Sequence, residues 1–288
     1  MEFCQLQTFR LVAAHRSFSQ AAAELHLTQP AVTQQIKHLE SEIGELLLDR
    51  SGRNLGLTPA GEVFLTYTHQ ILNLTEQAVA TVRQYSDQKG KLSIAAGTTN
   101  TIFRLPLILQ NYRNEHPQIE IQIRNGDSKL TTQLVRDNAV DLGFVTTINT
   151  KDSSFQVLPI FKDSIWLIGP KNYPSRVTIP DLEKESLILF RNGSGFRIFL
   201  EENFHRNHFI PKISMEMESI EAIIRLVQTG FGLSFLPEIA VQEELVGERV
   251  QKVEVKEWTS MYRQTYLIYR KDKYLAWPVK AFLHQVCG

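Results

Sequence analysis

The sequence predicts an α/β protein with a small helical domain, one long helix after it, and a larger domain in which strands and helices alternate. Three successive patterns of hydrophobic spacing support this order. Up to about Leu57 the spacing is that of short helices, and from Thr58 to about Ser86 it is that of one uninterrupted helix. From Lys91 onward, short apolar strands alternate with helical stretches. We therefore expect domains over residues 1–58, 59–88 and 91–288.

The composition is that of a folded protein with no overall charge bias. The 288 residues are 43% hydrophobic and 22% charged, and 31 basic residues balance 31 acidic ones. A nucleic-acid surface would therefore have to come from local clustering of charge. Cys4 and Cys287 lie near opposite ends and form neither a disulfide framework nor a metal-ligand spacing. With no signal peptide and no apolar run of about 18 residues, we expect a soluble cytoplasmic protein without a membrane partner.

Three short helices are expected in the first domain. Apolar residues at spacings of three and four from Leu6 onward predict the first helix. Ser17 and Gln20 form a capping-box pattern that predicts the start of the second helix. Thr28 is the expected N-cap of the third helix, so Pro30 falls in its first turn, where the backbone N–H groups have no helical partner to lose. Two short helices joined by a tight turn indicate a helix-turn-helix.

The third helix has one apolar and one polar side. Val32, Ile36 and Leu39 recur at helical spacing and predict the buried side. The segment that follows is typical of two short strands around Gly52–Gly56, which is a wing. Glutamine suits adenine edges in the major groove, and basic side chains reach phosphates or the minor groove. The candidate DNA contacts are Thr28, Gln29, Pro30, Thr33, Gln34, Lys37, Arg50 and Arg53, although each alone could equally be a solvated surface residue.

The long helix carries one apolar seam. At ~1.5 Å per residue it would reach roughly 40 Å. A long, narrow seam of this kind favours pairing with a second copy of the chain, and the alternative is packing onto the helix's own domain. The seam is formed by Ala60, Phe64, Tyr67, Ile71, Leu74, Ala78, Val82 and Tyr85.

The third domain has the alternation of an open parallel sheet covered on both faces. Strands are expected at "KLSIAAG", "QIEIQIR", "DLGFVTT" and "LSFLP", and helices over Phe103–Glu115, Lys129–Asn138, Phe196–Asn207 and Ile220–Thr229. Where the first strand meets its helix, hydroxyl and amide side chains gather at Thr98, Thr99, Asn100 and Thr101. Free backbone N–H groups and the helix dipole at such a place suit a small anion, and ordinary helix capping is the alternative.

The first sixty residues resemble a known family. The chain contains an F-x-x-A-A second helix at Phe18, the run "TQPAVT" in the third helix, "IKHLE" at its end, and "LTPAG" after the wing. This segment is similar to the winged helix-turn-helix of LysR-type transcriptional regulators. The family usually has Phe where this chain has Leu48, a conservative change in the core. The resemblance continues into "MEMESIEAIIRLVQTGFGLSFLPEIAV", so it covers nearly the whole chain.

The resemblance implies a regulator that binds a double-stranded DNA operator and a small-molecule effector, without a cofactor. The C-terminal region is expected to have a two-lobed, periplasmic-binding-protein-like fold, with lobe I over about residues 91–161 and 270–288, lobe II over about residues 162–269, and hinges near Asp163 and Tyr269. Homodimers paired through the linker helix, homotetramers, and RNA polymerase as a further candidate partner are also implied. The candidate effector contacts are Thr98, Thr99, Asn100, Thr101, Ser128, Thr146, Thr147, Phe190, Arg191, Glu218 and Ser219.

Other classes of function find less support in the sequence. An effector carboxylate could also be held by Arg191 or Arg197, although exposed arginines are more often only solvated. An enzyme is not expected, because Phe235 stands where a dinucleotide fingerprint requires Gly or Ala, and Asn192 replaces the first glycine of a G-x-S-x-G motif. No histidine pair has the H-x-x-x-H spacing on a helix. A solute receptor would not carry the DNA-binding domain, and a structural nucleoid protein would leave the large cleft domain unexplained.

Overall fold

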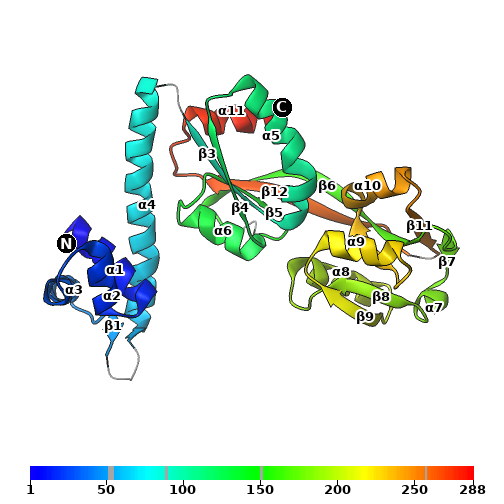
Figure 1. Ribbon diagram of the computed structural model, residues 1–288, viewed down its shortest axis with the longest axis horizontal. Helices are drawn as coiled ribbons and strands as arrows, with labels where there is room; N and C mark the ends of the chain where they lie inside the picture. Colours follow the sequence, from blue (N-terminus) through cyan, green and yellow to red (C-terminus); the bar gives the residue numbers. More distant parts are fainter. Residues whose placement is uncertain (51–54, 88–89, 150–151, 257) are drawn as a thin grey trace. The chain divides into compact units, whose positions relative to one another are not determined.

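The computed structural model describes residues 1–50, 55–87, 90–149, 152–256 and 258–288. The chain divides into two compact units, one with the N-terminal helices and the long helix, the other with most of residues 90–288 (Figure 1). Within the described residues, no helix is both long and apolar enough to cross a lipid bilayer.

The N-terminal unit is a winged helix-turn-helix. Its elements are α1 (Phe3–His15), α2 (Phe18–Leu25), α3 (Gln29–Ile43), the antiparallel strands β1 (Leu48–Asp49) and β2 (Gly56–Leu57), and α4 (Pro59–Asp87). The predicted N-caps are confirmed: Ser17 accepts a hydrogen bond from the Gln20 N–H, and Thr28 accepts one from the Ala31 N–H. The predicted buried side of α3 is also confirmed, since Val32, Ile36 and Leu39 have no exposed surface.

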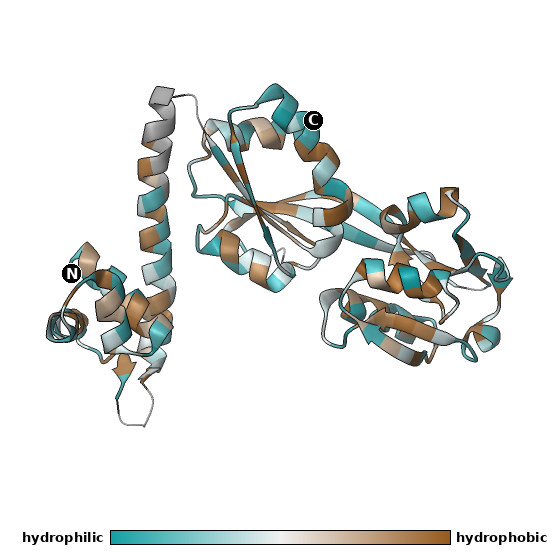
Figure 2. Ribbon diagram, in the orientation of Figure 1, coloured by the Kyte–Doolittle hydropathy of each residue, from teal (hydrophilic) through white to brown (hydrophobic). Residues whose placement is uncertain are grey.

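Helix α4 begins against this domain and then extends away from its core. Near its start, Ala60 and Phe64 pack onto the core of the domain, and the Phe64 ring lies 5.4 Å from that of Phe9. The described part of the helix further exposes six large apolar side chains, Val63, Tyr67, Ile71, Leu74, Val79 and Val82, and the first four follow at spacings of four, four and three. Hydrophobic residues recur along the helix in Figure 2. The first residues of the predicted seam, Ala60 and Phe64, therefore pack within their own domain, whereas later ones are exposed. The predicted seam residue Tyr85 has a side chain outside the described part.

The second unit is built on one continuous mixed sheet of eight strands. Its first elements are β3 (Lys91–Ala96), the π-helical turn η1 (Asn100–Arg104), α5 (Leu105–Glu115), β4 (Glu120–Asn125), α6 (Ser128–Arg136), β5 (Leu142–Val145) and β6 (Phe155–Pro170). Next come β7 (Arg176–Val177), α7 (Ile179–Leu182), β8 (Ser186–Phe190), α8 (Gly195–Arg206), β9 (Lys212–Met217), α9 (Ile220–Gln228) and β10 (Ser234–Pro237). The last are α10 (Glu238–Val246), β11 (Val250–Val255), β12 (Met261–Arg270) and α11 (Trp277–Cys287).

The expectation of a parallel sheet holds only locally. Strand β3 is parallel to both β4 and β5, and β8 is parallel to β9. However, β12 is antiparallel to β5 and to β6 over most of its length. The chain leaves the first lobe along β6 and returns along β12, so the two crossing strands run in opposite directions (Figure 1). These two long strands join the lobes.

Separate hydrophobic cores define the two lobes. One core contains Leu92, Phe144 and Leu267, and another contains Ile165 and Met261. The first crossover therefore lies close to the predicted hinge at Asp163. The second, predicted near Tyr269, lies earlier, because β12 passes from the core of lobe II to that of lobe I between Met261 and Leu267. Its pairing with β6 shifts register within this stretch, between Thr265 and Tyr266.

Candidate DNA-binding and effector-binding sites

The polar side of α3 presents the predicted DNA contacts. Each of these side chains is at least partly exposed, and they are Thr28, Gln29, Pro30, Thr33, Gln34 and Lys37. The Thr33 hydroxyl donates to the Gln29 carbonyl oxygen at 2.9 Å, so its proton is already used within the helix. Among the described residues, nothing hydrogen bonds the side-chain amides of Gln29 and Gln34. Both amides therefore remain available to bases in a groove.

Arg50 has a structural partner that the sequence did not indicate. Its guanidinium donates to Glu40 Oε2 at 2.8 Å and lies over the Phe18 ring. Glu40 is 6% exposed, and its Oε1 accepts hydrogen bonds from the N–H groups of Leu47 and Leu48 at 3.0 and 3.2 Å. This carboxylate thus joins the end of α3 to the first strand of the wing. The other predicted wing contact, Arg53, lies outside the described residues.

The predicted anion site in lobe I lies where β3 enters η1. Thr98 is exposed and Thr99 is half-buried, while the Thr101 hydroxyl donates to the Gly97 carbonyl oxygen at 3.2 Å. Asn100 is only 4% exposed, yet no described residue hydrogen bonds its side-chain amide. The amide atoms are not fully enclosed, so they can still bind water or a ligand.

A second polar cluster links β5, α6 and β12. The Ser128 hydroxyl oxygen accepts hydrogen bonds from the Thr146 and Thr147 N–H groups at 3.0 and 3.3 Å. Its oxygen is also 3.3 Å from Thr146 Oγ1. Arg263 donates from Nη2 to Thr146 Oγ1 at 2.6 Å. The structure therefore brings together Ser128 and Thr146, two predicted contacts, with Arg263, which no sequence motif marked.

Charged side chains converge beside this cluster at the crossing of the lobes. Arg263 and Asp163 are register partners on β12 and β6. Asp163 forms an ion pair with Arg104 of η1, and the Arg104 guanidinium lies 4.2 Å from the centre of the Phe161 ring. Arg263 itself lies over the rings of Phe196 and Phe199 in α8. Burial lowers the pKa of Arg263 to about 10, while the charge of Asp163 acts to raise it. Arg263 therefore remains a cation at neutral pH.

The predicted contacts in lobe II are less closely grouped. The Phe190 ring packs edge-on against that of Phe196 at 5.0 Å, next to Arg263. Arg191 and Glu218 form an exposed ion pair at 3.2 Å, and the Ser219 hydroxyl caps α9 by accepting from the Ala222 N–H. No contact between described residues joins these three to Arg263 or Thr146.

Arg197, the other candidate for an effector carboxylate, is already satisfied. Its side chain donates to Glu201 at 2.7 Å, to Glu216 at 3.1 Å and to the Phe190 carbonyl oxygen at 3.1 Å. With 4% of its surface exposed, it stabilises lobe II from within. It is therefore not available to an added anion.

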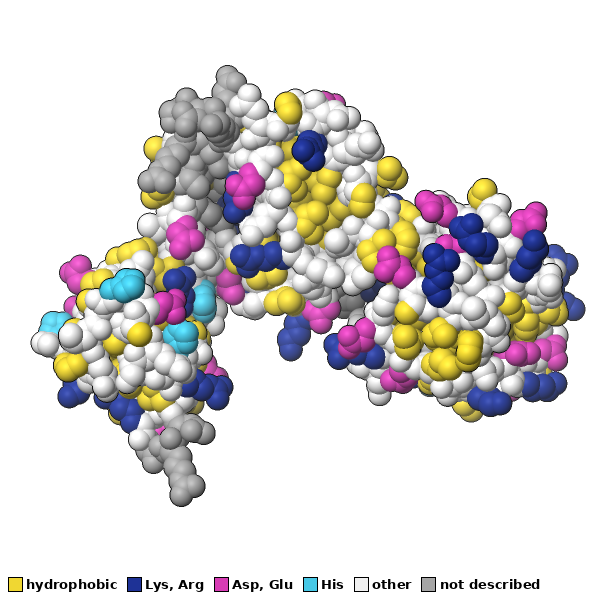
Figure 3. Space-filling model, in the orientation of Figure 1, with side chains coloured by type: hydrophobic (Ala, Val, Ile, Leu, Met, Phe, Trp, Pro, Cys, Tyr) yellow, Lys and Arg dark blue, Asp and Glu magenta, His cyan; other side chains and the backbone are white. Residues whose placement is uncertain are grey.

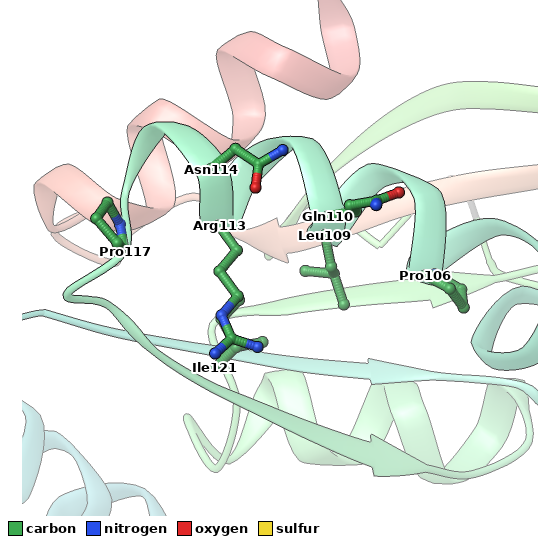
Figure 4. Close-up of a pocket in the computed structure, with 7 residues that line it drawn as sticks. All are labelled: Pro106, Leu109, Gln110, Arg113, Asn114, Pro117 and Ile121. Carbon is green, nitrogen blue, oxygen red and sulfur yellow. The ribbon is translucent and has the colours of Figure 1, made fainter.

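A separate hollow lies on the outer surface of lobe I, between α5 and β4 (Figure 4). It is lined by Pro106, Leu109, Gln110, Arg113, Asn114, Pro117 and Ile121. Figure 3 shows apolar side chains gathered on the same side of α5. None of these residues belongs to the Ser128–Thr146–Arg263 cluster, so the hollow and the interlobe site are different surfaces.

Comparison with known proteins agrees with both parts of this description. Residues 3–62 match the model of the bacterial regulatory helix-turn-helix protein, lysR family, and residues 86–287 match the LysR substrate binding domain. The chain is 33% identical to the uncharacterized HTH-type transcriptional regulator YwqM of Bacillus subtilis (strain 168), over 98% of this chain and 97% of that one.

Two solved structures have a similar fold. Full-length CbnR in complex with its target DNA is 23% identical, with a TM-score of 0.72 over 100% of this chain and 99% of that one. The effector binding domain of QuiR in complex with shikimate is 22% identical, with a TM-score of 0.58 over 69% of this chain and 95% of that one.

A winged helix-turn-helix, a long linker helix and a two-lobed ligand domain together define a ligand-responsive DNA-binding transcriptional regulator, not an enzyme. The chain belongs to the LysR family, because the substrate-binding model alone covers more than half of it. Its partners are an operator DNA and a small-molecule effector, and oligomers are typical of the family.

Proposed function

We propose that α3 reads the operator in the major groove through Gln29, Gln34 and Thr33, while Lys37 contacts a phosphate. The support is the exposed polar face of α3 above a fully buried apolar one, with both glutamine amides unengaged. Arg50 and Arg53 of the wing are the accompanying backbone or minor-groove contacts. Arg50 would contact DNA through the guanidinium N–H groups that do not bind Glu40, because its Nη2 already donates to that carboxylate. The structure of CbnR with its target DNA, on a related fold, favours this reading.

The protein acts as a homodimer joined through α4, and a homotetramer is formed by pairs of these dimers. Val63, Tyr67, Ile71 and Leu74 support this, because they are 37–61% exposed and follow one another at the spacing of a coiled-coil seam. A second copy of the helix would remove this apolar surface from water. Because its target is DNA, we place the protein in the cytoplasm.

The effector is a small anion held between the two lobes. The observation that carries this proposal is the charge balance at the lobe crossing, where Arg104 and Arg263 face a single carboxylate, Asp163. Asn100 adds a side-chain amide that no described residue hydrogen bonds, and Thr98 and Thr99 add hydroxyls at the same helix start. QuiR, whose effector domain binds shikimate, a carboxylate, has a similar fold. We keep Phe190, Arg191, Glu218 and Ser219 as peripheral contacts.

DNA selection with the full-length protein tests the first proposal. An operator is selected from a random DNA pool, and its affinity is measured for Gln29→Ala and Lys37→Ala. Gln29→Ala should weaken the selected site by about 1–3 kcal/mol and leave non-specific DNA unchanged. Lys37→Ala should weaken both and reduce the dependence of affinity on salt concentration by about one phosphate contact. Lys212→Ala, on an exposed strand of lobe II, is the control. Unchanged affinity in both α3 variants would remove α3 from the interface.

A further inference from the structure

Arg263 is in contact with both lobes at once. Its guanidinium donates to Thr146 Oγ1 at the end of β5 in lobe I, and its carbon Cζ lies 4.7 Å from the centre of the Phe196 ring in lobe II. The π electrons of an aromatic ring attract a guanidinium stacked on its face, but the ring carries no net charge and does not neutralise the cation. Stacking against the ring also leaves the N–H groups in the guanidinium plane free to meet a ligand at its edge.

Arg263 is partly buried, and it differs from Arg197 and Arg104 in lacking its own carboxylate. Arg197 is bound to Glu201 and Glu216, and Arg104 is bound to Asp163. No described carboxylate lies within ion-pair distance of Arg263, and the nearest acid that influences it is the Asp163 already engaged by Arg104. Taking a cation out of water without a partner is costly, so this arrangement stabilises little by itself. One positive charge is left over at the lobe crossing.

The surroundings of this charge also favour an anion. A Cβ built on Gly195, the first residue of α8, would lie 4.0 Å from Arg263 Nη2. The guanidinium is therefore next to the N-terminus of a helix of 12 residues, whose free N–H groups attract negative charge. Thr146 and Ser128 add hydroxyl groups from lobe I. The guanidinium, the helix N–H groups and the two hydroxyls can all donate hydrogen bonds to an anion.

We propose that Arg263 binds the carboxylate of a monocarboxylate effector through its free guanidinium edge, and so determines the specificity of the interlobe site. This rests on the proposal of an anionic effector. A single carboxylate balances the one unpaired charge, whereas a dianion would bring a second charge with no cation left to receive it. The two oxygens of a carboxylate match the two parallel N–H bonds that a guanidinium offers. Because Arg263 touches Thr146 and Phe196, binding there acts on both lobes.

The test is thermal unfolding of the full-length protein with acetate, benzoate, shikimate, succinate, sulfate and phosphate, each compared with chloride at equal ionic strength. A monocarboxylate at about 100 times its Kd should raise Tm by roughly 5–10 °C. Arg263→Met should abolish that shift, and Arg263→Lys should weaken the affinity about tenfold, because lysine cannot form the paired bonds. Arg176→Gln, which alters an exposed arginine paired with Glu254, should behave as the wild type.

The unliganded variants give a second measurement that does not depend on the choice of ligand. If the charge of Arg263 is uncompensated, Arg263→Met should leave the unliganded Tm unchanged or raise it, whereas Arg197→Met should lower it. An equal loss in both would make Arg263 a structural residue and overturn the proposal. So would a shift with sulfate, phosphate or succinate alone, or no shift with any monocarboxylate. An unaltered monocarboxylate shift in Arg263→Met would also overturn it, but would leave an anionic effector in place.

Discussion

Replacing Glu40 tests how the wing is attached to the recognition helix. Its carboxylate accepts two backbone N–H groups, from Leu47 and Leu48, in a site where Glu40 itself is 6% exposed. In Glu40→Ala both N–H groups lose their partner, and a buried donor left unsatisfied costs about 1–3 kcal/mol. We expect a loss of about 3 kcal/mol in the free energy of unfolding of this domain. Glu40→Gln keeps an acceptor oxygen and should cost about 1 kcal/mol.

The assay separates the two units by their spectroscopic signals. Trp166, Trp258 and Trp277 all lie outside the N-terminal unit, so their fluorescence follows the second unit, while far-UV circular dichroism also follows the helices of the first. In urea, Glu40→Ala should shift the dichroism transition to lower concentration and leave the fluorescence transition in place. Arg50→Ala, which removes a partner whose side chain is 38% exposed, should cost less than about 1 kcal/mol. If Glu40→Ala is no more damaging than Arg50→Ala, the carboxylate does not hold the wing.

Three further outcomes are expected. Gly61→Ala would place a Cβ 2.0 Å from the Leu47 carbonyl oxygen, and thermal unfolding should show a loss of about 3 kcal/mol; an unchanged Tm would mean that α4 is packed differently. Leu74→Glu, at a site 55% exposed, should convert the dimer to a monomer in sedimentation experiments, and a persisting dimer would refute pairing through α4. Burial lowers the pKa of His69 below 6.5, so unfolding takes up a proton below that pH and stability falls as the pH drops through this range. In His69→Gln this decline in Tm between about pH 7 and 5 should become shallower, and an unchanged slope would exclude His69 as its source.

Local chemistry made the helix-turn-helix predictable. The N-caps at Ser17 and Thr28, the proline in the first turn of α3, and the stripe of Val32, Ile36 and Leu39 each depend on neighbours within one or two turns of helix. Four helices of the second unit were predictable for the same reason, whereas the long strands β6 and β12 were not among the expected elements. The expected helix over Phe196–Asn207, for example, differs by one residue at each end from α8.

Contacts between side chains that are distant in the sequence were not predictable. Arg50 was expected only as a DNA contact, and its bond to Glu40 depends on how the wing folds back onto α3. Arg197 was considered as a carboxylate ligand or a solvated side chain, yet the strand that carries Glu216 is brought to it by the parallel pairing of β8 and β9. In both cases the sequence shows a charged side chain but not its partner.

The sequence by itself determined the class of this protein, because helix caps, buried stripes and the motifs of a LysR-type regulator are written in neighbouring residues. Only the tertiary structure decided where its charges are left without partners. Arg263 is separated by more than a hundred residues from Thr146, its hydrogen-bond partner, and it reaches that hydroxyl because β12 returns antiparallel to β5 and β6. A side chain's burial and its counterions depend on contacts of that range, which no local pattern encodes.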